Sequence, residues 1–362
     1  MSCLFVKFVL GTSKFLQRGI DLSRITVSAC RTTSWSSIFV NRMLQPGVAA
    51  ESSHEDENRR TENNVNKQKL ILGTAAAFFG LFGSDEKEDD KIPDLIMAIK
   101  RSILLIQRED FKKAEQMLHI ALRQAQTLQH YEAITYIYDI MANLAFDVGD
   151  YQKAEKLFVS VMQRLISTGT PKDDMKIIHI SLKMAKIYQM TGDIQKAEDG
   201  FDFCFKSLQK RIDSHKEDED VILLWAMTLD WYARLLFEQS RHTEALNSFL
   251  KAYELCVRIN GREHEQTVVL LNDLGTISSL RGDDDEAIDY LSEAVEIGKK
   301  LPDMVDLGSI HVNLGNVYMK KGLYEAAKKS CQEGWKLSKN RNNEESLTEA
   351  SNCLNEIKRL LS

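Results

Sequence analysis

Apolar residues recur along most of this 362-residue chain at gaps of three and four, the period of one face of a helix. One such stripe lies before Gly149 and consists of Ala133, Ile137, Ile140, Met141, Leu144 and Ala145. A second stripe follows it and consists of Ala154, Leu157, Phe158, Val161, Met162 and Leu165. The two stripes predict a hairpin of two helices joined by a short turn.

The same arrangement recurs six times, each time as a turn, then an alanine, then a large apolar residue four positions on. The recurring alanines are Ala114, Ala154, Ala197, Ala245, Ala287 and Ala327. A period of about 40 residues is typical of a solenoid, in which each unit packs against its neighbours. The pattern therefore predicts one all-helical domain over residues 92–362, a class that presents binding surfaces more often than catalytic pockets.

The predicted turns have the residues that a helix ending and a helix start require. Four glycines are placed to adopt the left-handed conformation that ends the first helix: Gly149, Gly192, Gly282 and Gly322. The aspartates that follow three of them are expected to cap the second helix: Asp150, Asp193 and Asp283. The alanine of each unit is small, so the two helices of a hairpin can approach closely.

The end of the chain predicts one further amphipathic helix, which would cover the exposed last repeat. Its apolar positions are Leu347, Leu354, Ile357, Leu360 and Leu361.

These units resemble the tetratricopeptide repeat, in which a large residue, Leu-Gly, Tyr, Gly, Ala and Phe stand at fixed offsets. The best match is Leu314, Gly315, Tyr318, Gly322, Tyr324 and Ala327. The unit around Ser102 and Ala114 is degenerate. The spacing of about 42 residues resembles the long repeats of kinesin light chains. The resemblance implies an all-α tetratricopeptide-repeat solenoid of five to six helical hairpins, closed by a C-terminal helix.

The first fifty residues have a composition typical of a mitochondrial transit peptide. They contain six Lys or Arg residues and one acid, Asp21, and they are rich in Ser and Thr. A basic tail without structure and a poor secretory signal are the alternatives. Without this segment the net charge falls from −6 to −11. Such an acidic protein is a poor candidate for binding nucleic acid.

Residues 51–69 form a polar linker, and residues 70–84 form an uncharged stretch, LILGTAAAFFGLFGS. A helix of this length reaches only about 22 Å, which is short of the roughly 30 Å hydrocarbon core of a bilayer. Basic residues precede the stretch and an acidic cluster follows it. We therefore expect a short anchor in the mitochondrial inner membrane, with the repeat domain in the intermembrane space.

The sequence contains no pattern typical of a catalytic, metal or cofactor site. The six cysteines lack paired spacing, and Cys204 and Cys331 fall on apolar helix positions, so both are expected to be buried, inert thiols. His264-Glu265 lacks the second histidine of a metalloprotease helix, and no glycine-rich phosphate loop is present. We expect a protein that is not an enzyme.

In the tetratricopeptide-repeat family, the first helices of the hairpins line a groove that binds peptides. The resemblance places seven polar residues toward that groove: Asn143, Lys186, Arg234, Asn272, Asn313, Asn316 and Lys320. It places three apolar residues beside them: Phe146, Phe237 and Met319. Asparagine can bond both donors and acceptors of a peptide backbone, which suits sequence-tolerant capture. Helix capping or plain solvent exposure is the alternative for each residue.

Two expectations follow from this register. Asp139 stands one turn before Asn143, where chaperone-binding members have lysine, so capture of a C-terminal carboxylate is disfavoured. Replacing Asn272 and Asn316 by alanine is expected to weaken client binding and to leave thermal stability nearly intact.

The order of the parts resembles mitochondrial members of the tetratricopeptide-repeat family that are anchored in the inner membrane. The resemblance implies a non-enzymatic factor that supports assembly or maintenance of respiratory complex III, the cytochrome bc1 complex. The implied client is its Rieske iron–sulfur subunit or peptides derived from it. The alternative is a trafficking or import adaptor that faces the cytosol and binds peptide motifs through the same groove.

Overall fold

A computed structural model describes residues 92–214, 218–302 and 304–362. These residues form thirteen α-helices and no strand, which confirms the all-α prediction. The helices are α3 (Ile92–Gln107), α4 (Phe111–Thr127), α5 (Tyr131–Asp147), α6 (Tyr151–Ser167), α7 (Met175–Thr191), α8 (Ile194–Ser214), α9 (Glu219–Glu238), α10 (His242–Asn260), α11 (Glu265–Arg281), α12 (Asp284–Gly298), α13 (Leu307–Lys320), α14 (Tyr324–Asn340) and α15 (Glu344–Leu361).

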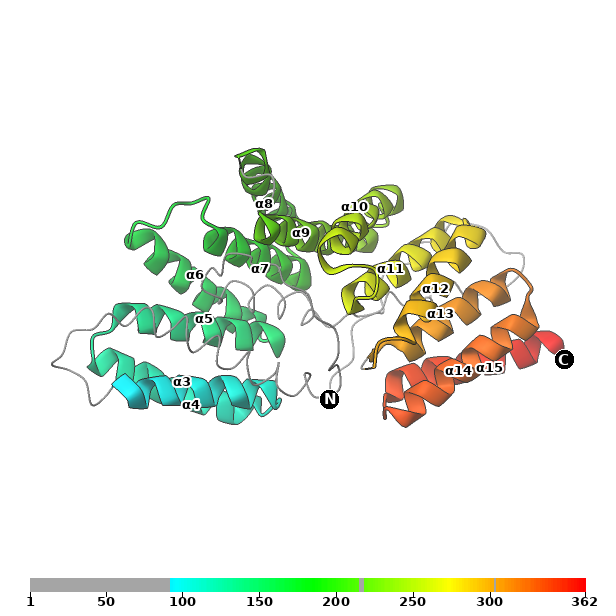
Figure 1. Cartoon of the computed structure of the whole chain (residues 1–362), viewed down its shortest axis with the longest axis horizontal. Helices are drawn as coiled ribbons and strands as arrows, with labels where there is room; N and C mark the ends of the chain where they lie inside the picture. The colour runs from blue at the N-terminus through cyan, green and yellow to red at the C-terminus, as the bar shows by residue number, and fades with distance from the viewer. Residues whose placement is uncertain (1–91, 215–217, 303) are drawn as a thin grey trace, which may run out of the picture.

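The helices α3 to α14 pair into six consecutive hairpins, each of which packs against the next. Within a pair, such as α5 and α6, the two helices contact each other along their length, and the second helix also packs on the first helix of the following pair. Figure 1 shows that the pairs follow one another along an arch, with α3 and α4 at one foot and α14 and α15 at the other. This serial packing is the predicted solenoid.

Small residues set the close approach inside each hairpin, as the sequence predicts. All six repeat alanines are completely buried. A methyl group added to Gly275 on α11 would lie 2.5 Å from Leu291 Cγ and 3.1 Å from the carbonyl oxygen of Ala287, both on α12. The two helices therefore touch through the backbone of α11 at this point, which a larger residue would prevent.

The turns between paired helices place one residue in the left-handed conformation. The four predicted glycines all adopt it, including Gly192 with a φ of 84°. Ser240 occupies the same place before α10 with a φ of 60°, although a side chain is disfavoured there. The turns at these five positions therefore share the same left-handed backbone conformation.

The predicted aspartate caps are only partly present. Asp150 accepts a hydrogen bond from the backbone nitrogen of Lys153 at 3.2 Å, and Asp193 accepts one from Lys196 at 3.4 Å. Asp283 makes no cap, because its carboxylate instead lies 3.5 Å from the guanidinium of Arg281. The prediction for Asp283 is therefore wrong.

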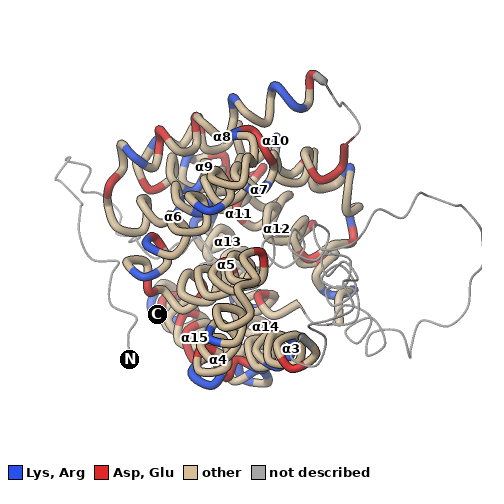
Figure 2. The backbone as a smooth tube through the Cα atoms, turned by 90° about the vertical axis from the view of Figure 1, so that its left-hand side faces the viewer, with Lys and Arg blue, Asp and Glu red and all other residues tan. Residues whose placement is uncertain are grey.

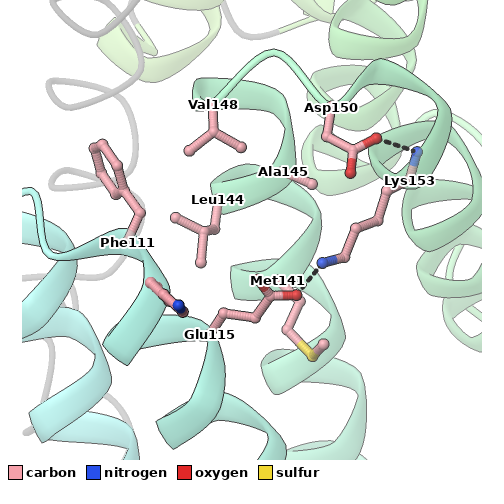
Figure 3. A pocket seen from close by; sticks show the side chains of 9 residues that line it. Phe111, Glu115, Met141, Leu144, Ala145, Val148, Asp150 and Lys153 are labelled. Atoms are coloured by element: carbon pink, nitrogen blue, oxygen red, sulfur yellow. Dashed lines mark hydrogen bonds and ion pairs between the residues drawn. The ribbon is translucent and has the colours of Figure 1, made fainter.

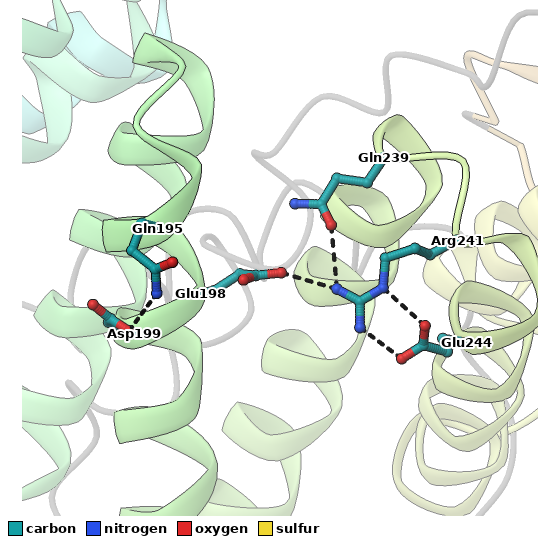
Figure 4. Close-up of polar contacts among 6 residues, drawn as sticks. All are labelled: Gln195, Glu198, Asp199, Gln239, Arg241 and Glu244. Atoms are coloured by element: carbon teal, nitrogen blue, oxygen red, sulfur yellow. Dashed lines mark hydrogen bonds and ion pairs between the residues drawn. The ribbon is translucent and has the colours of Figure 1, made fainter.

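An arginine occupies the cap position of α10, where it joins two repeats (Figure 4). Arg241 donates to both carboxylate oxygens of Glu244, at 2.8 and 2.6 Å, and to Glu198 on α8 at 2.9 Å. The hydrogen bonds between the guanidinium of Arg241 and the carboxylate of Glu244 favour the charged form of both groups. The pKa of Arg241 is therefore raised, and that of Glu244 is lowered. Because these ion pairs are exposed to solvent, they are expected to contribute little to the free energy of unfolding.

Aromatic and aliphatic side chains fill the centre of the solenoid. The largest fully buried residues there are Phe158, Phe201, Trp231 and Phe249. Phe146 at the end of α5 stacks on Trp231 of α9, with ring centroids 6.1 Å apart, so the core runs across three consecutive repeats. Both acidic and basic positions are scattered over the helices that surround this core (Figure 2).

The closing helix α15 packs on α13 and α14, but its buried face differs from the prediction. The buried residues are Ser346, Ala350, Cys353 and Ile357. Leu360 and Leu361 are exposed. The predicted stripe is therefore confirmed at Ile357 and, as half-buried positions, at Leu347 and Leu354, and it is wrong at Leu360 and Leu361.

Cys331 is buried as predicted, but it is not a free thiol. It forms a disulfide with Cys353 of α15, which corrects the prediction of an inert thiol at this position. Cys204 is a free, buried thiol, and burial raises its pKa above the ordinary range, so the unreactive character predicted for it agrees with its surroundings.

The predicted transit peptide (1–50), linker (51–69) and anchor (70–84) lie outside the described residues. Within the part of the chain that the structure does describe, no helix has the length and apolar character needed to cross a membrane.

Candidate functional site

The seven polar residues predicted for the groove all lie on first helices of hairpins, from α5 to α13. Adjacent first helices contact each other directly, α7 with α9 and α11 with α13. The predicted residues and their polar neighbours therefore form a row that crosses the repeats, which we call the polar row. Its members come from the middle and the C-terminal half of each first helix.

The row begins between α5 and α7, where Lys183 donates a hydrogen bond to Asn143 Oδ1. The Nδ2 group of Asn143 donates to the carbonyl oxygen of Asp139 on its own helix at 2.8 Å. Burial lowers the pKa of Lys183, and the carboxylates of Asp139 and Asp147 oppose that shift. Burial likewise raises the pKa of Asp139, with Lys183 acting against it. Chaperone-binding members have a lysine at the position of Asp139. In this chain Lys183 of the next repeat places an ammonium group beside Asn143 instead.

The second group links α7 to α9. Lys186 Nζ donates to Gln189 Oε1 at 3.0 Å, and Gln189 Nε2 donates to Glu238 Oε2 at 2.7 Å. Only 6 % of Lys186 is exposed, and this burial lowers the pKa of its ammonium group to about 8, against the opposing charge of Glu238. Lys186 is therefore an internal residue rather than a free contact for a peptide.

The third group is an ion triad between α9 and α11. The guanidinium of Arg234 lies 3.2 Å from Asp230 and also contacts the carboxylate of Asp273. The side chain of Arg234 is 13 % exposed, whereas those of Asp230 and Asp273 are 2 % and 0 % exposed. Burial raises the pKa of Asp273 to about 7, with Arg234 acting in the opposite direction. Two buried carboxylates thus share one arginine.

The last group joins α11 to α13. Asn313 Nδ2 donates to Asn272 Oδ1 at 2.9 Å, and both side chains are almost fully buried. Lys320 Nζ donates to the carbonyl oxygen of Ser279 at 2.6 Å and to Asp284 at 2.7 Å. Asn316, one turn before Lys320, is half-buried.

The structure thus brings the predicted residues into one row, but it engages most of them with each other. Asn272 is 1 % exposed, so the assumption that it lies on the surface is wrong, and we now expect its replacement to lower stability. The expectation treated it as a surface residue, whereas its amide oxygen accepts a hydrogen bond in the interior. Phe146 and Met319 are also buried, and Phe237 packs edge-on against His242.

Sequence reasoning missed five members of the row: Lys183, Gln189, Asp230, Glu238 and Asp273. A signal for two of them is present in the sequence. Asn143 and Lys183 are 40 residues apart, and Arg234 and Asp273 are 39 residues apart, which is one repeat period. Complementary polar residues one period apart on first helices therefore indicate a contact across a repeat boundary.

One small cleft opens beside the first repeats, between α4, α5 and α6 (Figure 3). It encloses about 250 Å³ and is lined by apolar residues, including Phe111, Met141 and Val148. An ion pair between Glu115 and Lys153 borders it. Because small-molecule sites are usually larger, between about 300 and 1,000 Å³, this cleft is a gap between repeats. Among the described residues, no group of three or more His, Cys, Asp or Glu side chains is arranged to hold a metal ion.

The amino-acid sequence matches the tetratricopeptide repeat over residues 225–300 and again over residues 308–341. Several relatives align with most of the chain. The Drosophila melanogaster protein "Tetratricopeptide repeat protein 19 homolog, mitochondrial" is 40% identical over 289 residues, covering 80% of this chain and 78% of its own length. The chain belongs to the mitochondrial tetratricopeptide repeat protein 19 family.

Two further relatives are the proteins called "Tetratricopeptide repeat protein 19, mitochondrial" in Danio rerio and Homo sapiens. Each is 36% identical to this chain, the first covering 73% of the chain and 67% of the relative, the second 71% and 69%. Members of the family are thus mitochondrial tetratricopeptide-repeat proteins, which confirms the resemblance drawn from the motif.

Solved structures similar to this one share only the fold. The Rap protein complexed with competence and sporulation factor superposes with a TM-score of 0.57 at 16% identity, over 92% of this chain and 86% of that one. BtubC from P. vanneervenii superposes with a TM-score of 0.50 at 19% identity, over 72% and 94%. Both comparisons agree with a helical-repeat architecture for the tetratricopeptide repeat protein 19 family.

Proposed function

We propose that this chain is a non-enzymatic scaffold of the mitochondrial inner membrane that binds subunits or peptides of respiratory complex III. The Rieske iron–sulfur subunit is the client that the family resemblance implies, and support of complex III assembly or maintenance is the role. Family membership supports the mitochondrial part of the proposal. The solenoid supports the scaffold part, because stacked repeats present one long surface to a second polypeptide.

The observation that carries the proposal is the polar row. It extends from α5 to α13 and alternates ammonium, guanidinium, amide and carboxylate groups. Their mutual hydrogen bonds hold these side chains in place before a client arrives, so a client need not order them on binding. The half-buried members Asn143 and Asn316 and the exposed Glu238 remain at the boundary with solvent. A row of this kind favours an extended polypeptide of mixed charge.

Client binding is tested by affinity purification of the tagged full-length chain from mitochondria, with subunits quantified by mass spectrometry. Complex III subunits, and the Rieske subunit among them, are expected above the level of an untagged control. Asn316→Ala is expected to reduce their recovery by roughly fivefold, the effect of about one lost hydrogen bond. Asn247→Ala makes the same change on the exposed side of the second helix α10 and is expected to have no effect. Recovery of no complex III subunit would refute the proposed client.

Location is tested separately by protease protection. The repeat domain is expected to resist protease in intact mitochondria and to be digested once the outer membrane is ruptured. Digestion in intact mitochondria would instead place the solenoid in the cytosol and favour the trafficking or import adaptor.

A further inference from the structure

The position four residues after the repeat alanine has an unusual occupant in the last hairpin. In the five preceding hairpins it is Leu118, Phe158, Phe201, Phe249 and Leu291, and each is at most 1 % exposed. In α14 it is Cys331, which is completely buried. A cysteine therefore stands where every other repeat has a large core residue.

A cysteine is smaller than the leucine or phenylalanine of the other repeats, and a side chain from outside the hairpin fills the remaining volume. Cys353 of α15 reaches the same site, and its Cα lies 6.3 Å from that of Cys331, within the range that a disulfide spans. Gly315 on α13 faces the sulfur of Cys331 so closely that any side chain there would collide with it. The bonded sulfurs therefore occupy the place that a leucine or phenylalanine occupies in the other repeats.

The buried side chains through which α15 packs are mostly small. The core cluster at this end consists of Val312, Met319, Ala327, Cys331, Ala350, Cys353 and Ile357. Its buried members include no aromatic residue, whereas the buried members of the central cluster include five. On α15 itself the buried side chains other than Cys353 are a serine, an alanine and an isoleucine. The disulfide thus adds a covalent link at a contact whose fully buried side chains are mostly small.

We propose that the Cys331–Cys353 disulfide is a redox clip that docks the closing helix α15 onto the last repeat. When the bond is reduced, α15 leaves α13 and α14, and the end of the solenoid opens. The clip is independent of the identity of the client, because it lies at the end of the domain.

The clip closes by thiol–disulfide exchange with an oxidised dithiol oxidoreductase, which is the oxidant. Cys353 loses a proton, and its thiolate attacks the oxidoreductase disulfide to give a mixed disulfide and one departing thiolate. The thiolate of Cys331, which has also lost a proton, then attacks the sulfur of Cys353 and displaces the second thiolate. Two electrons and two protons thereby pass to the oxidoreductase. Because both sulfurs are buried in the finished fold, the exchange takes place while α15 is undocked.

The bond is tested in the full-length chain purified from mitochondria after free thiols have been blocked by an alkylating agent. Mass spectrometry is expected to recover the peptides that contain Cys331 and Cys353 as one linked pair. Cysteines 204 and 256 are expected only as alkylated thiols after denaturation. Alkylated Cys331 and Cys353, without any linked form, would overturn the proposal.

Docking is tested by hydrogen–deuterium exchange of the same protein with and without a reductant. Reduction is expected to accelerate exchange over residues 344–361 roughly a hundredfold, as for release of a 22-residue loop closure, and to leave α9 to α12 unchanged. Cys353→Ala is expected to give the fast exchange without reductant, and Cys256→Ala to retain the reductant response. Unchanged protection of residues 344–361 in the reduced wild-type chain would refute the clip even if the disulfide exists.

Discussion

Replacing Arg234 by methionine is expected to destabilise the middle of the solenoid strongly. Methionine keeps most of the length and apolar surface of the arginine stem but removes the guanidinium that lies between Asp230 and Asp273. The two carboxylates, on α9 and α11, are then left without the cation that they share. The perturbation therefore isolates the charge of one residue at a repeat boundary.

The magnitude follows from burial. The side chains of Asp230 and Asp273 are 2 % and 0 % exposed, so water cannot replace the lost cation. Removing one partner of a buried ion pair costs about 3–5 kcal/mol of unfolding free energy, because a buried charge remains uncompensated. We expect a loss in this range near pH 8.

The loss is expected to depend on pH in a definite direction. The pKa of Asp273 in the folded chain is already raised to about 7, well above the value of about 3.9 for an unfolded aspartate. A raised acid pKa contributes stability below the unfolded value and loses it as pH rises through the folded value. Arg234 opposes this shift, so its removal raises the pKa further. The variant should therefore recover part of its deficit near pH 5, where Asp273 is protonated.

The assay is urea unfolding followed by far-ultraviolet circular dichroism at both pH values. Arg241→Met is the matched control, because it makes the same chemical change at an arginine whose ion pairs are exposed to solvent. The control is expected to leave the midpoint nearly unchanged, as is usual for surface ion pairs. An unfolding free energy of Arg234→Met within about 1 kcal/mol of the wild-type value near pH 8 would refute the reasoning that the two carboxylates are left uncompensated in the interior.

Four further changes are expected to shift the thermal unfolding temperature, one of them upward and three downward. Ser240→Gly should stabilise the fold by about 1 kcal/mol, because it removes a side chain from a residue with positive φ. Gly282→Ala, at the equivalent turn, should destabilise the fold by a similar amount. Equal unfolding temperatures for the two variants would contradict this. Gly275→Ala should destabilise by about 1–3 kcal/mol, since its methyl group meets the facing helix, and an unchanged temperature would disprove the close contact. Asn272→Ala should cost about 1–3 kcal/mol by leaving the amide of Asn313 without its acceptor, whereas a neutral result would restore the surface interpretation.

Local patterns were enough to predict the hairpins and their turns. Glycines at 192 and 282 must adopt a conformation that other residues avoid, so their positions mark helix ends directly. Alanines such as Ala287 recur at one period because a close helix contact excludes larger residues. Both features act within one hairpin, and the sequence therefore contains them in full.

The candidate site was predicted less completely, because its contacts join residues from different repeats. The register correctly placed Asn143 and Arg234 on first helices. It did not reveal that Lys183 and Asp273 meet them from the next repeat, nor that Asn272 is inside the protein. Helical periodicity distinguishes one face of a helix from another but does not tell how deeply a neighbouring helix covers that face.

The sequence by itself determined an all-helical solenoid, its repeat period and the glycines that end its helices, because these depend on backbone conformation and on contacts inside one unit. Only the tertiary structure decided which polar residues satisfy one another across repeats, and that Cys331 meets Cys353 on the closing helix. Those outcomes depend on the distance and orientation between packed helices. Such geometry is set by all the side chains of the interface together and not by the spacing of any one motif.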